Sequence, residues 1–123
     1  MTRRVLLIDD DDLIREVTEL TLVHVAGYEV VSAPSGEEGI RAAHEHLPDA
    51  ILLDVMMPGL DGPSTLEWLR ADPVTRDVPV VFMTAKLQPA ERSRLELLGV
   101  AGVIAKPFDP QEMVAELARM LSW

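Results

Sequence analysis

The hydrophobic positions of the chain change period repeatedly, from short continuous runs to longer stretches with helical spacing. The short runs are aliphatic and often β-branched, and most of them do not alternate with polar residues. This pattern is typical of strands that are buried on both faces of a sheet. The five runs cover residues 5–8, 30–31, 50–53, 78–83 and 100–105. We therefore predict five strands of a parallel sheet.

Between these runs, apolar residues recur at intervals of three and four, which predicts five amphipathic helices. We expect Leu13 and Val17, in the first helix, to face the core. Ile14 lies off their stripe, so it either faces the core as well or is exposed and docks a partner helix. The residues that mark the five helices are Leu13, Val17, Leu20 and His24, then Ile40, Ala43 and Leu47, then Leu66, Trp68 and Leu69, then Leu95 and Leu98, and finally Met113, Leu117, Met120 and Leu121.

Cap and turn residues agree with these helix boundaries. They occur at Ala26-Gly27, Ser35 with Glu38, Gly62-Pro63, Asp72-Pro73, Gly99 and Asp109-Pro110. The strict alternation of strand and helix predicts an α/β fold, with a doubly wound five-stranded parallel sheet, helices on both faces and right-handed crossovers. The chain contains no linker and no low-complexity tract, so we expect one domain over residues 1–123.

The composition narrows the class of protein. With 48% hydrophobic and 26% charged residues among 123, the chain fits a soluble globular domain. Its net charge of −10 argues against direct binding of nucleic acid. The absence of cysteine excludes disulfides, thiolate metal sites and cysteine nucleophiles. No apolar stretch approaches the roughly 18 residues of a membrane span, and no signal peptide is visible, so we expect a cytoplasmic protein without membrane contact.

Polar residues that suit metal and phosphate chemistry follow four of the predicted strands. Asp9 and Asp10 follow the first strand, Asp54 the third, Thr84 the fourth and Lys106 the fifth. In open α/β sheets, ligands bind beyond the carboxyl ends of the strands. We therefore expect these side chains to converge at one edge of the sheet.

Such a cluster favours Mg²⁺ and a phosphoryl group. Mg²⁺ is typically held by one or two carboxylates together with phosphate oxygens and water, so we expect Asp10 and Asp54 to ligate it and Asp9 to orient a bound water. Asp54 is the best placed nucleophile, because carboxylates form covalent intermediates in phosphoryl transfer. Lys106 and Thr84 can donate to the transferred oxygens. The simpler interpretation of residues 9–12, acidic residues at a helix N-terminus, does not explain the matching residues on the other strands.

Four segments together resemble the receiver domain of bacterial two-component response regulators, in particular the single-domain chemotaxis type. They are residues 7–11, 53–62, 83–85 and 105–108. The resemblance implies a flavodoxin-like (βα)5 fold with strand order 2-1-3-4-5. It implies that Asp54 accepts a phosphoryl group from a phosphohistidine of a sensor histidine kinase or a histidine phosphotransfer protein. The phosphorylated form would then change its binding to a downstream protein or effector domain, and a phosphorylation-dependent dimer is left open.

The resemblance also implies roles for the remaining residues of the site. Asp9, Asp10, Asp54 and the backbone carbonyl of Met56 would hold Mg²⁺, the only cofactor implied. Thr84 and Lys106 would sense the phosphoryl group, and the Lys106-Pro107 bond would be cis. The domain would catalyse only its own phosphorylation and dephosphorylation.

Three positions, at Val103, Met56 and Lys86, bear on how this switch differs from its relatives. Receiver domains usually carry Tyr or Phe three residues before the site lysine, whereas this chain has Val103, which has no ring to reorient. We therefore expect less rearrangement around the fifth strand. Met56 and Lys86 lie two residues past Asp54 and Thr84, beside the expected path of water to the phosphoryl group. Because the Met56 side chain cannot orient water, we expect a long-lived phosphoaspartate.

Two other functions fit parts of the pattern. A magnesium-dependent phosphohydrolase of the haloacid dehalogenase type would also form an aspartyl phosphate, but it needs a second acid at the position of Met56. A flavodoxin-like cofactor binder would use the same edge of the sheet, but residues 9–12 are all aspartates and would repel a phosphate that lacks a metal.

Overall fold

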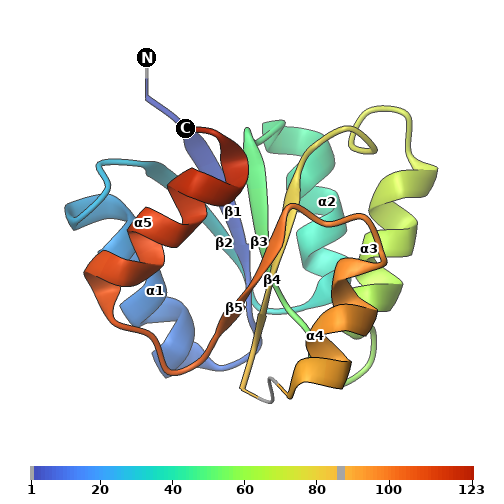
Figure 1. The fold of residues 1–123 in the computed structure, drawn as a ribbon. Helices are drawn as coiled ribbons and strands as arrows, with labels where there is room; N and C mark the ends of the chain where they lie inside the picture. The colour runs from blue at the N-terminus through green and yellow to red at the C-terminus, as the bar shows by residue number, and fades with distance from the viewer. Residues whose placement is uncertain (1, 86–87) are drawn as a thin grey trace.

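The computed structural model of the protein describes residues 2–85 and 88–123. Within these residues, five strands and five helices alternate along the chain, as the sequence predicts (Figure 1). The strands are β1 (Arg4–Ile8), β2 (Glu29–Ala33), β3 (Ala50–Asp54), β4 (Val80–Thr84) and β5 (Gly102–Ala105). The helices are α1 (Asp12–His24), α2 (Gly36–His46), α3 (Gly62–Ala71), α4 (Pro89–Glu96) and α5 (Pro110–Leu121).

The strands form one parallel sheet in the order β2-β1-β3-β4-β5, which confirms the flavodoxin-like topology. The strand order reverses between β1 and β3, so the loops after these two strands diverge to opposite faces of the sheet. In such folds a ligand site lies at this point of reversal. The predicted strand boundaries shift slightly, because β4 begins at Val80 and β5 at Gly102, two residues later than the apolar runs.

Helices cover both faces of the sheet, with α1 and α5 on one face and α2, α3 and α4 on the other (Figure 1). Alternate residues of β1 supply the two cores. Val5 and Leu7 belong to the cluster that includes residues of α1 and α5, whereas Leu6 and Ile8 belong to the cluster on the other face. All four are fully buried. A strand that is buried on both faces therefore reads as a continuous apolar run.

Side-chain caps fix the starts of four helices where the sequence places them. The carboxylates of Asp11, Asp61 and Asp109 and the hydroxyl of Ser35 each accept a backbone N–H of the first helical turn. Each such cap stabilises a helix by about 1 kcal/mol. The end of α2 differs from the prediction, because Leu47 follows the helix in a left-handed conformation with φ 48° and is exposed.

The apolar stripe of α1 faces solvent rather than the core, so this expectation was wrong. Leu13 is 70% exposed, Val17 46% and Leu20 50%, and Ile14 is half-buried. The residues of α1 that pack against the sheet are Thr18, Thr21 and Leu22. The spacing predicted the helix correctly, but spacing alone cannot say which face of a helix meets the sheet. None of the helices in the described part of the chain is long and apolar enough to cross a membrane.

The buried hydroxyl of Thr18 predicts a gain in stability on its removal. Thr18 is fully buried, and its Oγ1 has no hydrogen-bond partner among the described residues. Because an unpaired buried hydroxyl is unfavourable, Thr18→Val should raise the free energy of unfolding by about 1 kcal/mol in urea titrations. The matched control is Thr21→Val: the Thr21 hydroxyl donates to Val17 O at 2.9 Å, so its removal should leave the free energy of unfolding unchanged or lower it. A loss of stability in Thr18→Val would contradict this prediction.

Candidate functional site

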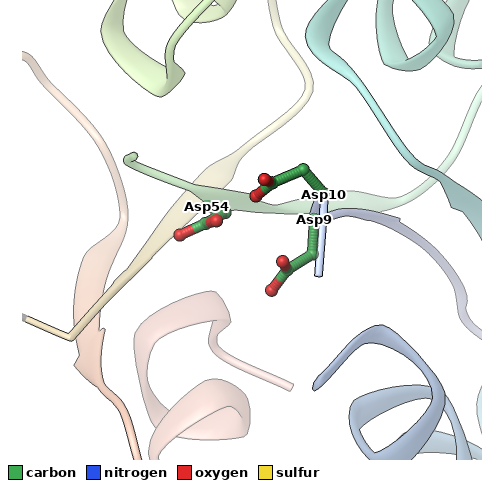
Figure 2. Close-up of side chains that lie close together, drawn as sticks. All are labelled: Asp9, Asp10 and Asp54. Atoms are coloured by element: carbon green, nitrogen blue, oxygen red, sulfur yellow. The ribbon is translucent and has the colours of Figure 1, made fainter. Parts of the chain in front are cut away.

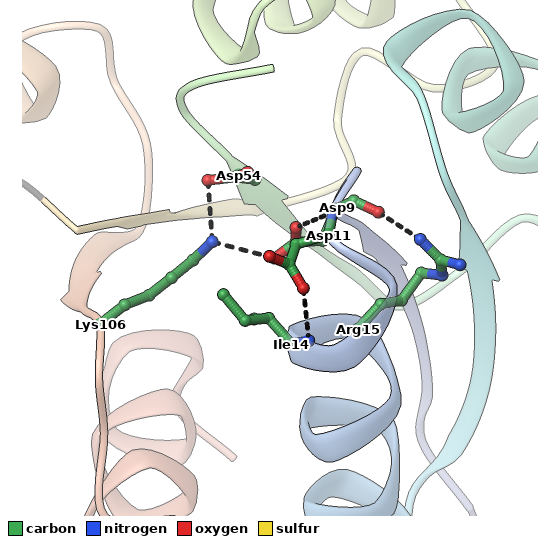
Figure 3. Close-up of polar contacts among 6 residues, drawn as sticks. All are labelled: Asp9, Asp11, Ile14, Arg15, Asp54 and Lys106. Carbon is green, nitrogen blue, oxygen red and sulfur yellow. Dashed lines mark hydrogen bonds and ion pairs between the residues drawn. The ribbon is translucent and has the colours of Figure 1, made fainter. Parts of the chain in front are cut away.

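The acidic and basic residues predicted from the strand ends meet at one edge of the sheet (Figures 2 and 3). Asp9 directly follows β1, Asp54 is the last residue of β3, and Lys106 directly follows β5. The carboxyl ends of these parallel strands point the same way, so residues up to 97 positions apart in the chain come into contact. The site lies where the strand order reverses, as expected for this fold.

Lys106 joins the two buried carboxylates of the site. Its Nζ donates to Asp9 Oδ2 at 3.0 Å and to Asp54 Oδ1 at 3.0 Å (Figure 3). The side chains of Lys106, Asp9 and Asp54 are only 9%, 0% and 7% exposed. Charges that are removed from water to this degree are stable only when paired, so the three groups form one electrostatic unit.

Asp9 is held in place by the N-cap and the first turn of α1. Its Oδ1 accepts the backbone N–H of Asp11 at 2.9 Å, and its backbone carbonyl accepts Arg15 Nη1 at 2.8 Å (Figure 3). Arg15 also pairs with Asp12 at 2.6 Å. With both carboxylate oxygens engaged, Asp9 has a fixed orientation beneath the site. Sequence reasoning missed Arg15, and the three-residue spacing from Asp12 was the only signal for it.

Asp10 completes a cluster that fits a divalent cation. Carboxylate oxygens of Asp9, Asp10 and Asp54 all lie within 4.8 Å of one another (Figure 2). Asp10 is exposed, whereas Asp9 and Asp54 are buried, so the cluster opens to solvent on the side of Asp10. Oxygen ligands on a half-open site match the preference of Mg²⁺, which keeps several waters and ligand positions for phosphate oxygens. Three carboxylates at this distance also repel one another unless a cation lies among them.

The turn after Asp54 depends on a close backbone approach at Gly62. The Gly62 N–H donates to Val55 O at 2.9 Å. A Cβ at this position would lie 2.6 Å from Asp54 O, which no side chain tolerates. Gly62 therefore holds the loop back against the end of β3. Within this loop the Met56 side chain is 60% exposed, and the Met56 carbonyl as a metal ligand stays a prediction.

Thr84 lies at the same edge, at the end of β4. It is buried, and it follows Met83, the register partner of Asp54. Its backbone carbonyl accepts the Lys106 N–H at 2.9 Å, which ties β4 to the start of the next loop. The Lys106-Pro107 peptide bond is cis, as predicted. Lys86, the second residue expected beside the path of water, lies outside the described residues.

Burial shifts the titration of both partners in the ion pair. Desolvation raises the pKa of Asp54 from 3.8 to about 6, against the opposing effect of the bond to Lys106, and the negative charge of Asp9 adds to the increase. Desolvation lowers the pKa of Lys106, but the bonds to Asp9 and Asp54 outweigh it and raise the pKa above its ordinary 10.5. At neutral pH the Lys106 ammonium is therefore charged. The Asp54 carboxylate is mostly ionised, but its pKa lies only about one unit below the pH.

Comparison with known proteins decides the family. The model of the response regulator receiver domain matches residues 5–118. The chain belongs to this family. Receiver domains are the phosphoacceptor signalling switches of two-component response regulators, and an acidic cluster that fits Mg²⁺ agrees with this assignment.

Individual relatives support the assignment over the full length of the chain. This receiver domain is 38% identical over 118 residues to the probable transcriptional regulator ycf27 of Guillardia theta, which aligns 96% of this chain with 45% of that protein. It is 36% identical over 121 residues to the phosphate regulon transcriptional regulatory protein PhoB of Escherichia coli (strain K12), with 98% and 52% covered. The chain thus spans about half the length of the curated relatives it matches.

A solved receiver domain has the same fold and a metal. It belongs to the sensor histidine kinase PA1611 of Pseudomonas aeruginosa PAO1, with a magnesium ion coordinated in its active site cleft. The two chains are 31% identical, are each covered completely, and superpose with a TM-score of 0.87.

The raised pKa of Asp54 predicts that the free energy of unfolding depends on pH, because the ionised carboxylate destabilises the folded state. Between about pH 4 and pH 6 the folded receiver domain binds a proton at Asp54 more tightly than the unfolded chain does, so this group lowers the free energy of unfolding as pH rises. Asp54→Asn, which mimics the protonated acid, should match the native protein near pH 4 and exceed it by up to about 3 kcal/mol at pH 7.5 in metal-free buffer. Lys106 does not contribute in this range, because its ordinary pKa is 10.5.

Urea titrations at both pH values, with and without Mg²⁺, measure this difference. Mg²⁺ should stabilise the native receiver domain at pH 7.5 and leave Asp54→Asn nearly unchanged. A stability difference between the two proteins that does not change with pH would contradict the prediction.

Proposed function

We propose that Asp54 accepts a phosphoryl group from the phosphohistidine of a sensor histidine kinase or a histidine phosphotransfer protein, in a magnesium-dependent reaction. The phosphorylated form then changes its binding to a downstream protein or effector domain. One observation carries the proposal: a single ammonium group, Lys106 Nζ, bonds at once to Asp9 and Asp54 where a third carboxylate also lies close. That arrangement supplies a nucleophile, a cation site and a fixed positive charge together.

The chain itself supplies the nucleophile and the two donors that this chemistry needs, and the partner supplies the phosphohistidine. An ionised Asp54 oxygen attacks phosphorus, the phosphorus–nitrogen bond to histidine breaks, and the imidazole leaves with the bonding electron pair and takes up a proton. Asp54 then carries the phosphoryl group as a mixed anhydride. Lys106, now bonded to Asp54 Oδ1, keeps its positive charge next to the transferred oxygens. Thr84, buried at the end of β4, supplies the hydroxyl donor.

Magnesium is the cofactor that these residues fit. Asp9, Asp10, Asp54 and the backbone carbonyl of Met56 would hold it, and when bound it would offset the negative charge of carboxylates and phosphoryl oxygens together. The separation of the three carboxylates and the solvent opening at Asp10 support the three carboxylate ligands of this set.

A groove beside the site fits the helix of the phosphodonor. It has a volume of about 430 Å³ and lies between α1 and the loop that follows β5, with Lys106 among its lining residues. Leu13, Ile14, Val17 and Phe108 are among the residues that line it, and Leu13 and Val17 are exposed. An amphipathic helix buries such a stripe with its own apolar face. Docking here would bring a phosphohistidine on that helix close to Asp54.

We assign residues 1–123 to the receiver domain and propose that it acts in the cytoplasm. It catalyses only its own phosphorylation and dephosphorylation. The net charge of −10 disfavours contact with nucleic acid by this chain, so output passes through proteins, through an attached effector domain or through a phosphorylation-dependent dimer.

Phosphorylation by a small donor tests the acceptor directly. With acetyl phosphate and Mg²⁺, the native chain should gain one phosphoryl group that is labile to base and hydroxylamine and maps to Asp54, as mass spectrometry would detect. Asp54→Ala should gain none, and omission of Mg²⁺ should prevent labelling of the native chain. Labelling at another residue would overturn the assignment of Asp54. Steady hydrolysis of a diffusible phosphate ester would instead favour a magnesium-dependent phosphohydrolase.

The side chain at position 56 predicts the lifetime of the phosphoaspartate. Met56 is 60% exposed, and its apolar side chain offers no hydrogen-bonding group that could orient water toward Asp54. Met56→Asn should speed loss of the phosphoryl group by about an order of magnitude, because a positioned polar side chain can hold the attacking water. The decay of purified phosphoprotein after removal of acetyl phosphate gives the rate. Met56→Leu is the matched control and should decay as the native chain does; an unchanged rate in Met56→Asn would refute the idea.

A further inference from the structure

Helix α4 has few apolar anchors of its own. Of its residues only Leu95 is buried, and its N-cap, Gln88, makes no side-chain capping bond. In contrast, α5 buries Met113 and Leu117 and is capped by Asp109. A short helix with one buried residue is held in place mainly by other contacts, and these contacts therefore decide where α4 lies.

Two arginines supply the contacts. Arg92, in α4, donates from Nη2 to the backbone carbonyl of Val103 in β5 at 2.9 Å. Its Nε also pairs with Glu96 at 3.0 Å, which orients the guanidinium. At the other end, Arg70 of α3 donates to Leu98 O and, at 2.9 Å, to Gly99 O. Both arginines thus hold backbone carbonyls, where charge-assisted hydrogen bonds are strong.

Val103 connects α4 to the sheet in two ways. Its side chain is 1% exposed and belongs to the same core cluster as Leu95, the buried residue of α4. Its carbonyl accepts Arg92. Strand β5 is last in the sheet order, so Arg92 provides a donor to an edge strand. The contact uses a backbone atom and does not need an aromatic ring at position 103.

The same strand leads into the candidate phosphorylation site. Lys106 lies three residues after Val103, and its N–H is bonded to Thr84 O. Thr84 in turn precedes the segment that leads to Pro89, the first residue of α4. α4 is therefore tied to the site twice, once along the chain from Thr84 and once through Arg92 to β5.

We propose that the Arg92–Val103 hydrogen bond is a latch that holds α4 in its unphosphorylated position and opens when Asp54 is phosphorylated. This inference rests on the proposed function, in which the Thr84 hydroxyl donates to the phosphoryl group on Asp54, and it adds that Thr84 moves toward that group. Movement of Thr84 passes along the chain to α4, while β5 stays paired with β4. α4 can then shift relative to β5 only when Arg92 releases the Val103 carbonyl. The latch stabilises the resting state alone, so it opposes phosphorylation.

Removal of the latch tests the proposal, because the proposal predicts tighter binding of a phosphoryl mimic and not weaker binding. Beryllofluoride with Mg²⁺, a mimic of the phosphoryl group, is titrated by calorimetry into the native chain and into Arg92→Ala. The variant should bind about three- to tenfold more tightly, which corresponds to one lost hydrogen bond of the resting state. A purely structural role for Arg92 predicts equal or weaker binding. Equal or weaker binding by a folded Arg92→Ala would overturn the proposal.

Two matched variants separate the latch from general charge effects. Arg94→Ala removes the same charge from the same helix, and Glu96→Gln removes the ion pair of Arg92 while the bond to Val103 can persist. Both should bind beryllofluoride within about twofold of the native chain. If Arg94→Ala tightens binding as much as Arg92→Ala does, net charge and not the latch is responsible, and the proposal fails.

A measurement on the native chain decides the matter if Arg92→Ala does not fold. The carbonyl carbon of Val103 should shift in NMR spectra as its hydrogen bond to Arg92 is lost on addition of beryllofluoride and Mg²⁺, but not with Mg²⁺ alone. An unchanged Val103 signal in a chain that binds beryllofluoride would refute the latch. A native chain that neither binds beryllofluoride nor is labelled at Asp54 would instead refute the proposed function.

Discussion

The buried contact of Lys106 with Asp9 and Asp54 is the interaction on which the rest of the site depends. Three charged side chains with almost no exposure to water lie within hydrogen-bond distance, and the Lys106 ammonium is stable there because it is paired with carboxylates. The contact forms because β1 and β3 are neighbours in the sheet and a long lysine side chain reaches them from the end of β5 (Figure 3). The three side chains can therefore meet only because the strands lie in this order.

The balance of charge in this unit explains why it suits a reversible modification. Two acids share one ammonium, and a third acid lies on the solvent side. The cluster therefore has an excess of negative charge, which raises the pKa of Asp54 together with the larger effect of desolvation. A divalent cation at this cluster would relieve this excess, and a phosphoryl group would restore it. Each event changes the electrostatic energy of buried groups, where charges interact most strongly, so a local change can bias distant elements.

The surfaces of α1 and α4 are the ones that suit partners, because these helices bury few of their apolar residues in the core. Helix α1 presents Leu13 and Val17 to solvent beside the site and packs on the sheet partly through threonines. Helix α4 buries one residue and is held by arginine–carbonyl bonds. In contrast, the residues of β1, β3 and β4 are almost all buried. The buried sheet therefore positions the acids, and the helices that bury fewer residues surround it.

The sequence by itself determined the strands, the helices, the caps and the residues of the acidic site. Buried parallel strands appear as continuous apolar runs, and the carboxyl ends of such strands share one edge, so Asp9, Asp54 and Lys106 could be brought together without coordinates. Only the tertiary structure decided which face of α1 meets the sheet, that Arg15 supports Asp9, that Arg92 bonds α4 to β5, and that Arg70 holds the turn after α4. Helical spacing is the same for a buried stripe and an exposed one. These arginines bond to backbone carbonyls, which every residue type has. The sequence therefore gives no signal for such contacts.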